Sequence, residues 1–90
     1  MTIRIETRST RGATTIRLIG RMQAEHLREV EREIEVSGGT VTLDLEEVTL
    51  VDVQVVRFLG DCKSKGIDHV NASPYILDWI ARERERRRTE

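Results

Sequence analysis

The spacing of hydrophobic residues changes along this chain in a regular order, and that order constrains the fold more than any single motif. Near the N-terminus Ile3 and Ile5 alternate with polar residues, and Ile16 and Leu18 do so again after a polar stretch. Such alternation predicts two strands. The sequence TRGA between them contains Gly12, which can adopt a positive φ, so we expect an antiparallel hairpin.

A helical spacing follows the hairpin. Between residues 23 and 36 the apolar positions lie on one helical face: Ala24, Leu27, Val30 and Ile34. Ser37, Gly38 and Gly39 come next, and residues of these types commonly end helices. The pattern predicts a first helix over residues 23–36.

A third strand and a second helix are predicted next. The sequence TVTLDL (residues 40–45) places its apolar residues on one face and Thr42 and Asp44 on the other. We therefore expect the second face to be exposed to solvent. Asp52 then suits the N-cap of a helix that ends near Lys65. Four residues of that helix share an apolar face: Val55, Val56, Leu59 and Cys62.

The C-terminal part predicts one more strand and one more helix. Residues 67–72 form a short strand candidate, and Ser73 and Pro74 suit the N-cap and first position of a helix. Three apolar residues should dock that helix: Ile76, Leu77 and Ile80. Residues 82–90, RERERRRTE, are expected to form a charged helix end or tail.

Together these segments give the order β-β-α-β-α-β-α within one α/β domain spanning residues 1–90. Each β-α-β unit should cross over right-handedly, which makes its strands parallel. We therefore expect a single four-stranded mixed sheet, the first strand antiparallel and the rest parallel, with about three helices mainly on one face. Arg17, Thr42 and Asp44 fit a polar second face.

Composition argues against several classes of protein. The net charge of -1 gives no bias toward polyanions, and no apolar run approaches the roughly 20 residues that span a bilayer. The N-terminal sequence MTIRIETRS lacks the apolar core of a signal peptide. A single cysteine, Cys62, permits no internal disulfide, so we expect a cytoplasmic protein.

The sequence offers little for catalysis or metal binding. His26 and His69 lie far apart with no ligand at suitable spacing, so no metal site is expected. Cys62 lies on an apolar helix face and should be a core residue. Glu46 and Glu47 are neighbours in a predicted turn and cannot face a shared substrate as an acid/base pair. We expect a protein that is not an enzyme and has no cofactor.

The C-terminal arginines suggest a nucleic-acid hypothesis, because they could contact phosphates: Arg82, Arg84, Arg86, Arg87 and Arg88. Glu83 and Glu85 lower the net positive charge of this segment. They precede Arg87 and Arg88 by four and three residues, an order that favours ion pairs along a helix. A solvated helix end is the favoured interpretation.

The whole chain resembles a STAS domain, the module of sulfate transporters and anti-sigma-factor antagonists, and in particular the small stand-alone bacterial antagonists. Three stretches carry the resemblance: TTIRLIGRM, where a strand ends in an apolar-Gly turn, TVTLDLEEVTLVD, and GIDHVNASPYILDWI. The resemblance implies a signalling module that regulates transcription through protein contacts.

Two departures concern the site through which such antagonists switch. In the phosphorylatable members the strand before the second helix runs into an Asp-Ser-Ser-Gly-like sequence, whose second serine accepts phosphate from a partner kinase. Here Asp52 matches the aspartate, but Val53 and Gln54 stand where the serines would be, and Val55 replaces the glycine. Gln23 occupies the place of an acidic residue that usually follows the apolar-Gly turn.

Gln54, at the phosphoacceptor-equivalent position, has no hydroxyl to phosphorylate, although its amide can donate and accept hydrogen bonds. The resemblance implies a partner-binding surface without a working serine phosphoswitch, made of Met22, Gln23, Asp52, Val53 and Gln54. The alternative is that Gln54 is an ordinary solvated residue of the first helical turn.

By the same resemblance the partner could be an anti-sigma factor or serine kinase, another STAS protein, or a transporter ATPase, and a homodimer is possible. Two other functions stay open. One is a small nucleotide- or lipid-binding accessory protein, such as an ABC transporter STAS partner. The other is a basic-tailed nucleic-acid binder. A nucleotide site would need donors and charge at the second helix start, which Val53 and Val55 do not supply.

Overall fold

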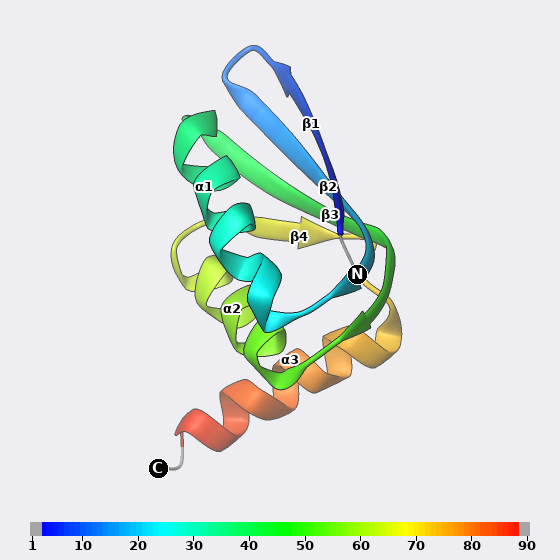
Figure 1. Cartoon of the computed structure of the whole chain (residues 1–90). Helices are drawn as coiled ribbons and strands as arrows, with labels where there is room; N and C mark the ends of the chain where they lie inside the picture. Colours follow the sequence, from blue (N-terminus) through cyan, green and yellow to red (C-terminus); the bar gives the residue numbers. More distant parts are fainter. Residues whose placement is uncertain (1–2, 89–90) are drawn as a thin grey trace.

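The computed structural model describes residues 3–88, in which the strands and helices follow the predicted order (Figure 1). The strands are β1 (Arg4–Thr10), β2 (Ala13–Met22), β3 (Thr40–Val51) and β4 (Asp68–Val70). The helices are α1 (Leu27–Ser37), preceded by a 3-10 turn η1 (Ala24–His26), α2 (Val53–Ser64) and α3 (Pro74–Arg88). Of the predicted tail, Thr89, Glu90 and the side chains of Arg87 and Arg88 lie outside the described part.

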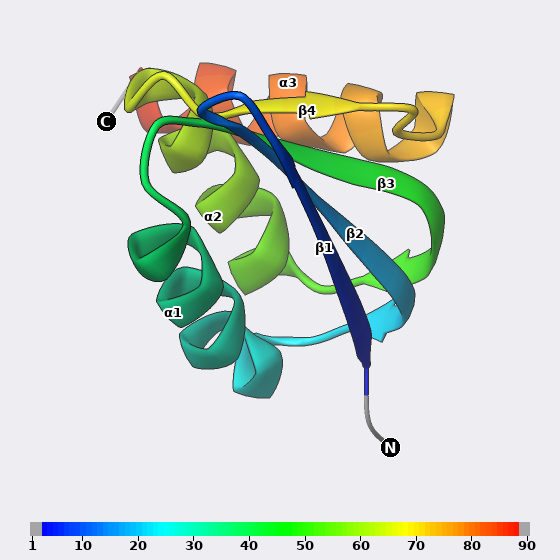
Figure 2. The same cartoon turned by 90° about the horizontal axis from the view of Figure 1, so that it is seen from above.

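The four strands form one mixed sheet in the order β1-β2-β3-β4. β1 is antiparallel to β2, while β2, β3 and β4 are parallel to one another. α1 and α2 lie together on one face of the sheet, and α3 packs against α2 at the β4 end of the molecule, away from β1 (Figures 1 and 2). The predicted fold class is confirmed.

β1 and β2 are joined by the predicted hairpin, whose two-residue turn consists of Arg11 and Gly12. Both residues have positive φ angles, 42° and 81°, as a type I′ turn requires. The carbonyl of Gly12 accepts a hydrogen bond from the N–H of Thr40 at 3.1 Å. The hairpin turn is therefore tied to the start of β3.

β3 is longer than predicted, because it continues through Glu46 and Glu47, which the sequence placed in a turn. Both glutamates are exposed, whereas Leu45 and Val48 on either side of them are buried. The pairing of β3 with β2 shifts register just after Arg17. Such a bulge inserts an extra residue and lets two successive side chains leave the core. The predicted turn was wrong because a bulge and a turn interrupt the alternation in the same way.

The core lies between the sheet and the helices. It includes Ile16, Leu18, Met22, Val30, Leu43, Leu45, Val55, Val56, Leu59, Cys62, Ile76 and Ile80. α3 enters this core through Ile76 and Ile80, as predicted, but Leu77 is 46% exposed. Trp79 packs against the core instead. Residues three and four apart share a helix face, and Leu77 is rotated about 100° away from Ile76.

The charged end of α3 is not wholly solvated, contrary to the prediction. Glu83 is only 5% exposed. It accepts a hydrogen bond from Arg57 Nε of α2 at 3.0 Å, and its other oxygen lies 3.5 Å from Nη1 of Arg86. Gly60 of α2 lies beside Arg84, and a Cβ at this position would be in ordinary van der Waals contact with Cγ of Arg84 at 3.6 Å. α3 is therefore docked by an ion pair as well as by apolar contacts.

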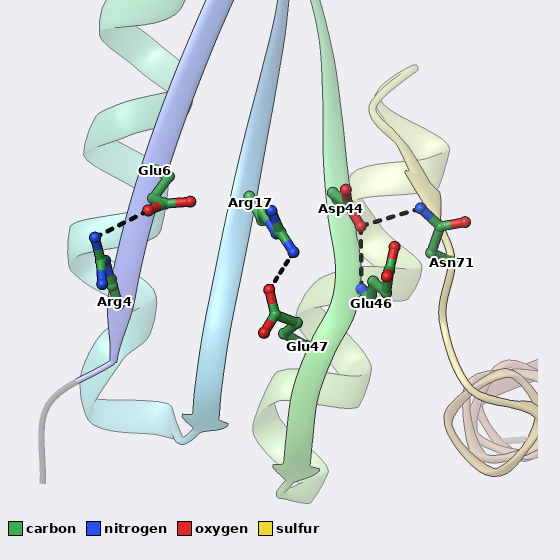
Figure 3. Close-up of polar contacts among 7 residues, drawn as sticks. All are labelled: Arg4, Glu6, Arg17, Asp44, Glu46, Glu47 and Asn71. Atoms are coloured by element: carbon green, nitrogen blue, oxygen red, sulfur yellow. Dashed lines mark hydrogen bonds and ion pairs between the residues drawn. The ribbon is translucent and has the colours of Figure 1, made fainter.

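The second face of the sheet is polar, and α1 and α2 lie behind it in Figure 3. We call it the open face. Its side chains interact with one another: Arg4 with Glu6 at 3.1 Å, Arg17 with Glu47, and Asp44 with the Glu46 N–H and the Asn71 amide (Figure 3). These contacts hold a polar surface together without an apolar layer above it.

Candidate protein-interaction site

The junction between β3 and α2 is organised by Asp52. Its backbone is extended, with φ −111° and ψ 177°, so it stands just outside the helix. Its Oδ1 accepts a hydrogen bond from the Val55 N–H at 2.9 Å and satisfies one of the free amides of the first turn. The predicted N-cap is confirmed.

The second oxygen of the same carboxylate bonds a different segment. Asp52 Oδ2 accepts a hydrogen bond from the N–H of Ala24 at 2.9 Å. Ala24 begins η1, just beyond the end of β2, where Met22 lies opposite Val51 in the parallel register. The carboxyl ends of β2 and β3 are therefore adjacent, and one carboxylate links them.

Gln23 forms the turn that leads from β2 into η1. Its carbonyl accepts a hydrogen bond from the His26 N–H at 2.9 Å, and its N–H donates to His26 Nδ1 at 3.1 Å. His26 is buried by this arrangement, with 8% exposure. The histidine thus shapes the turn, and Gln23 is exposed.

The five residues predicted to bind a partner differ in exposure. Gln23 and Gln54 are exposed, and Asp52 and Val53 are partly buried. Met22 is fully buried, because it ends β2 on the same inward face as Leu18. The prediction that Met22 contributes a side chain to a binding surface is therefore wrong. Met22 fills the core beneath that surface.

The chemistry of the junction is that of hydrogen bonding. No Ser, Thr or Tyr occurs between Thr49 and Ser64, so the first turns of α2 hold no hydroxyl. Burial raises the pKa of the Cys62 thiol to about 11, which keeps it protonated at neutral pH. Within residues 3–88 no group of three or more metal-ligating side chains is close enough to hold an ion.

A cleft that the sequence did not reveal begins beside Gln54. It has a volume of about 430 Å³, and it is lined by Leu27, Glu31, Gln54, Arg57, Phe58, Asp61 and Arg86. These residues come from α1, α2 and α3, so no local pattern could indicate the cleft. Arg57 is fixed in its wall by the contact with Glu83. Gln54 therefore belongs to the junction and also lines the cleft.

Comparisons with known proteins identify the fold. No protein-family model and no curated protein sequence matches the chain. A solved structure of the anti-sigma factor antagonist SpoIIAA in its unphosphorylated form is similar, with a TM-score of 0.61 and 19% sequence identity. The match covers 86% of this chain and 79% of that one. This likeness shows a STAS-like fold, as the sequence predicted, and it extends to the fold alone.

None of the helices within residues 3–88 combines the length and the apolar character needed to span a membrane.

Proposed function

We propose that this STAS-like domain is a non-enzymatic protein–protein interaction module. It acts as a cytoplasmic regulator of the anti-sigma-factor-antagonist kind and has no working serine phosphoswitch. Its binding surface consists of Gln23, Asp52, Val53 and Gln54, which we call the junction surface. The cleft beside Gln54 extends this surface toward α1 and α3.

The observation that carries the proposal is the double hydrogen bonding of Asp52. The carboxylate holds the start of η1 and the start of α2 at a fixed spacing. The exposed side chains of Gln23 and Gln54 are therefore presented from a rigid platform. Open α/β sheets commonly bind ligands at the carboxyl ends of their strands, and a preorganised surface loses less entropy on binding.

The residue at position 54 sets the electrostatic state of the junction surface. A phosphate would add about −1.5 to −2 charges there and could repel an acidic or apolar partner. Gln54 cannot acquire this charge, because an amide has no hydroxyl to phosphorylate. The junction surface is therefore always uncharged at this position, and binding depends on the abundance of the partner.

The charges around the cleft favour a protein over a nucleotide. Arg57 and Arg86 share the cleft with Glu31 and Asp61, so it has no excess of positive charge for phosphates. An anti-sigma factor or serine kinase, another STAS protein or a transporter ATPase is the class of partner that we propose.

The charges of α3 give little support to a nucleic-acid partner. Arg82 pairs with Asp78 at 2.7 Å, and Arg86 lies near Glu83. These contacts engage two of the tail arginines within the helix itself, which lowers the charge available for a phosphate backbone.

Capture of partners from a native lysate tests the proposal when three baits are compared: the wild type, Gln54→Glu and Ser64→Glu. Gln54→Glu places a permanent negative charge on the junction surface. Ser64→Glu places the same charge at the exposed far end of α2 and serves as the matched control. Quantitative mass spectrometry and an assay for bound nucleic acid measure what each bait recovers.

We expect the wild type and Ser64→Glu to recover the same protein, and Gln54→Glu to recover at least about ten-fold less, because an uncompensated interfacial charge is costly. Equal recovery by the two variants would contradict the proposed surface. Recovery of nucleic acid in place of protein would contradict the proposed class of partner.

A further inference from the structure

A second interaction surface lies at the β1 edge of the sheet. β1 pairs with β2 only, and α1 packs over β2, one strand further in. Within the described part of the chain no helix lies along the outer side of β1 (Figures 1 and 2). An uncovered edge strand offers a row of backbone N–H and C=O groups to another strand.

The hairpin register shows which backbone groups point outward. A two-residue turn makes Thr10 and Ala13, which flank it, a hydrogen-bonded pair. Bonded and non-bonded pairs alternate in antiparallel strands, so every second residue of β1 bonds β2: Arg8, Glu6 and Arg4. The residues between them direct their N–H and C=O groups away from β2: Ile5, Thr7 and Ser9.

β1 lacks the backbone features that commonly protect an edge strand, although three of its side chains are charged. It contains no proline or glycine, and its register with β2 is uninterrupted over all 7 residues. Arg4, Glu6 and Arg8 alternate in sign along the open face, where Glu6 and Arg8 border a hollow shared with Arg17. A row of one sign would repel a second copy of the strand, whereas alternating signs permit attraction.

We propose that β1 pairs with β1 of a second copy of this chain, antiparallel about a two-fold axis at Thr7, and so joins the two four-stranded sheets into one. In this register Ile5 lies opposite Ser9 of the second copy, and both exchange backbone hydrogen bonds. Glu6 lies opposite Arg8 of the second copy, and the symmetry creates this contact twice. The surface is separate from the junction surface and uses none of its residues.

The charges and the length of the overlap together select this register. An axis at Glu6 or at Arg8 would also align outward backbone groups, but it would set like charges opposite each other. An axis at Ile5 would keep Arg4 opposite Glu6 but would shorten the described overlap to residues 3–7. Only the axis at Thr7 uses the whole of β1 with opposite charges facing each other.

Glu33 of α1 opposes the association, and its effect depends on the register of the two strands. Thr7 Oγ1 donates a hydrogen bond to Glu33 Oε2 at 3.4 Å. An axis at Thr7 therefore brings the two copies of Glu33 toward each other, and two like charges in proximity repel. Removing the charge of Glu33 should strengthen the pairing.

Sedimentation equilibrium from about 1 µM to 1 mM covers the range of weak dimers and tests the proposal on the full chain. Glu6→Arg and Arg8→Glu each set like charges opposite at both symmetric contacts, and each should weaken dimerisation at least about ten-fold. The combined Glu6→Arg/Arg8→Glu variant again sets opposite charges face to face and should return within about three-fold of the wild type. Glu33→Gln should dimerise more tightly than the wild type.

Glu46→Arg is the matched control, because it makes the same charge change on an exposed residue of β3, two strands from the edge. It should leave the association unchanged. Circular dichroism verifies that each variant is folded. If a charge reversal unfolds the domain, Thr7→Pro replaces it in the test. This substitution removes an outward N–H that bonds no residue of β2, and it should abolish pairing.

Three results would overturn the proposal. The wild type could remain monomeric over the whole range. It could form a dimer whose association is unchanged by Glu6→Arg, by Arg8→Glu and by Thr7→Pro. The combined variant could associate as weakly as the single reversals, which would show that Glu6 and Arg8 do not face each other.

Discussion

The Asp52 carboxylate accepts a hydrogen bond from the backbone N–H of Ala24 at 2.9 Å, although 28 residues separate the two in sequence. Its other oxygen caps α2 through the Val55 N–H. A single side chain thus joins the ends of two parallel strands. The stability of the fold and the geometry of the junction surface depend on the same two bonds.

Substitutions of Asp52 separate the contributions of these two hydrogen bonds to the free energy of unfolding. Asp52→Ala removes both acceptors and should lower the free energy of unfolding by roughly 1–2 kcal/mol, as the loss of an N-cap does. Asp52→Asn keeps one oxygen to cap α2, but its amide nitrogen cannot accept from Ala24, so a smaller loss of about 0.5–1.5 kcal/mol is expected. Urea unfolding followed by circular dichroism measures both. Equal stability of the three proteins would mean that water replaces these bonds without cost.

The buried carboxylate of Glu83 should stabilise the docking of α3. Glu83→Gln removes the charge that faces Arg57 and Arg86, and we expect a loss of about 1–2 kcal/mol, at the lower end for a charged partner because the Arg57 side chain is 43% exposed. Glu85→Gln, two residues along the helix at an exposed position, should change stability by less than about 0.5 kcal/mol. Thermal and urea unfolding compare the two variants. The same loss in both would contradict the role assigned to Glu83.

Local signals explain why much of the fold could be predicted. Asp52 and Ser73 cap helices through hydrogen bonds to residues three positions ahead, so the sequence alone contains both partners. The turn at Arg11 and Gly12 is equally local. The order of these elements then determined the sheet, since crossover connections have one preferred hand.

The features that the sequence did not predict depend on distant residues. Glu83 is buried because Arg57 of α2 faces it, and nothing within the tail distinguishes Glu83 from Glu85. Met22 is the exception, because the alternation that places Leu18 in the core, continued along β2, also directs the Met22 side chain inward. The cleft beside Gln54 needs three helices, and its lining residues are far apart in the chain.

The thiol of Cys62 should make stability depend on alkaline pH. Burial raises its pKa in the folded protein from the ordinary 9.0 to about 11. Between these values the unfolded chain has lost the proton and the folded chain retains it, so the free energy of unfolding falls as the pH rises. The contribution is up to roughly 2–3 kcal/mol, from 1.36 kcal/mol for each pKa unit. Urea unfolding between pH 8 and 11 measures it.

Cys62→Ala is the reference for this measurement, since it removes the titrating group, and the difference between the two pH profiles isolates the thiol. A thiol reagent offers a second measurement, because it should react slowly with the native protein and rapidly in urea. Identical pH profiles for the wild type and the variant would contradict the assignment.

Phosphorylation should not occur at the start of α2. Incubation with serine kinases and ATP is expected to leave residues 50–63 unmodified, because this segment contains no hydroxyl side chain. Phosphopeptide mapping by mass spectrometry checks this. Thr49 is the nearest hydroxyl upstream and is exposed on β3. Stoichiometric phosphate on Thr49, with a loss of partner binding, would show that the switch has moved by a few residues and is not absent.

The central claim is that the junction surface binds a protein partner, and calorimetric titration of the purified partner with the wild type and with Gln54→Glu tests it most directly. Gln54 is exposed, so the substitution should change the free energy of unfolding by less than about 1 kcal/mol. Gln54→Met, of similar size and without charge, separates the loss of the amide from the gain of charge. We predict that Gln54→Glu binds at least about ten-fold more weakly than the wild type, while it remains folded. Equal affinities of the two folded proteins would contradict the account, because the partner would then bind elsewhere.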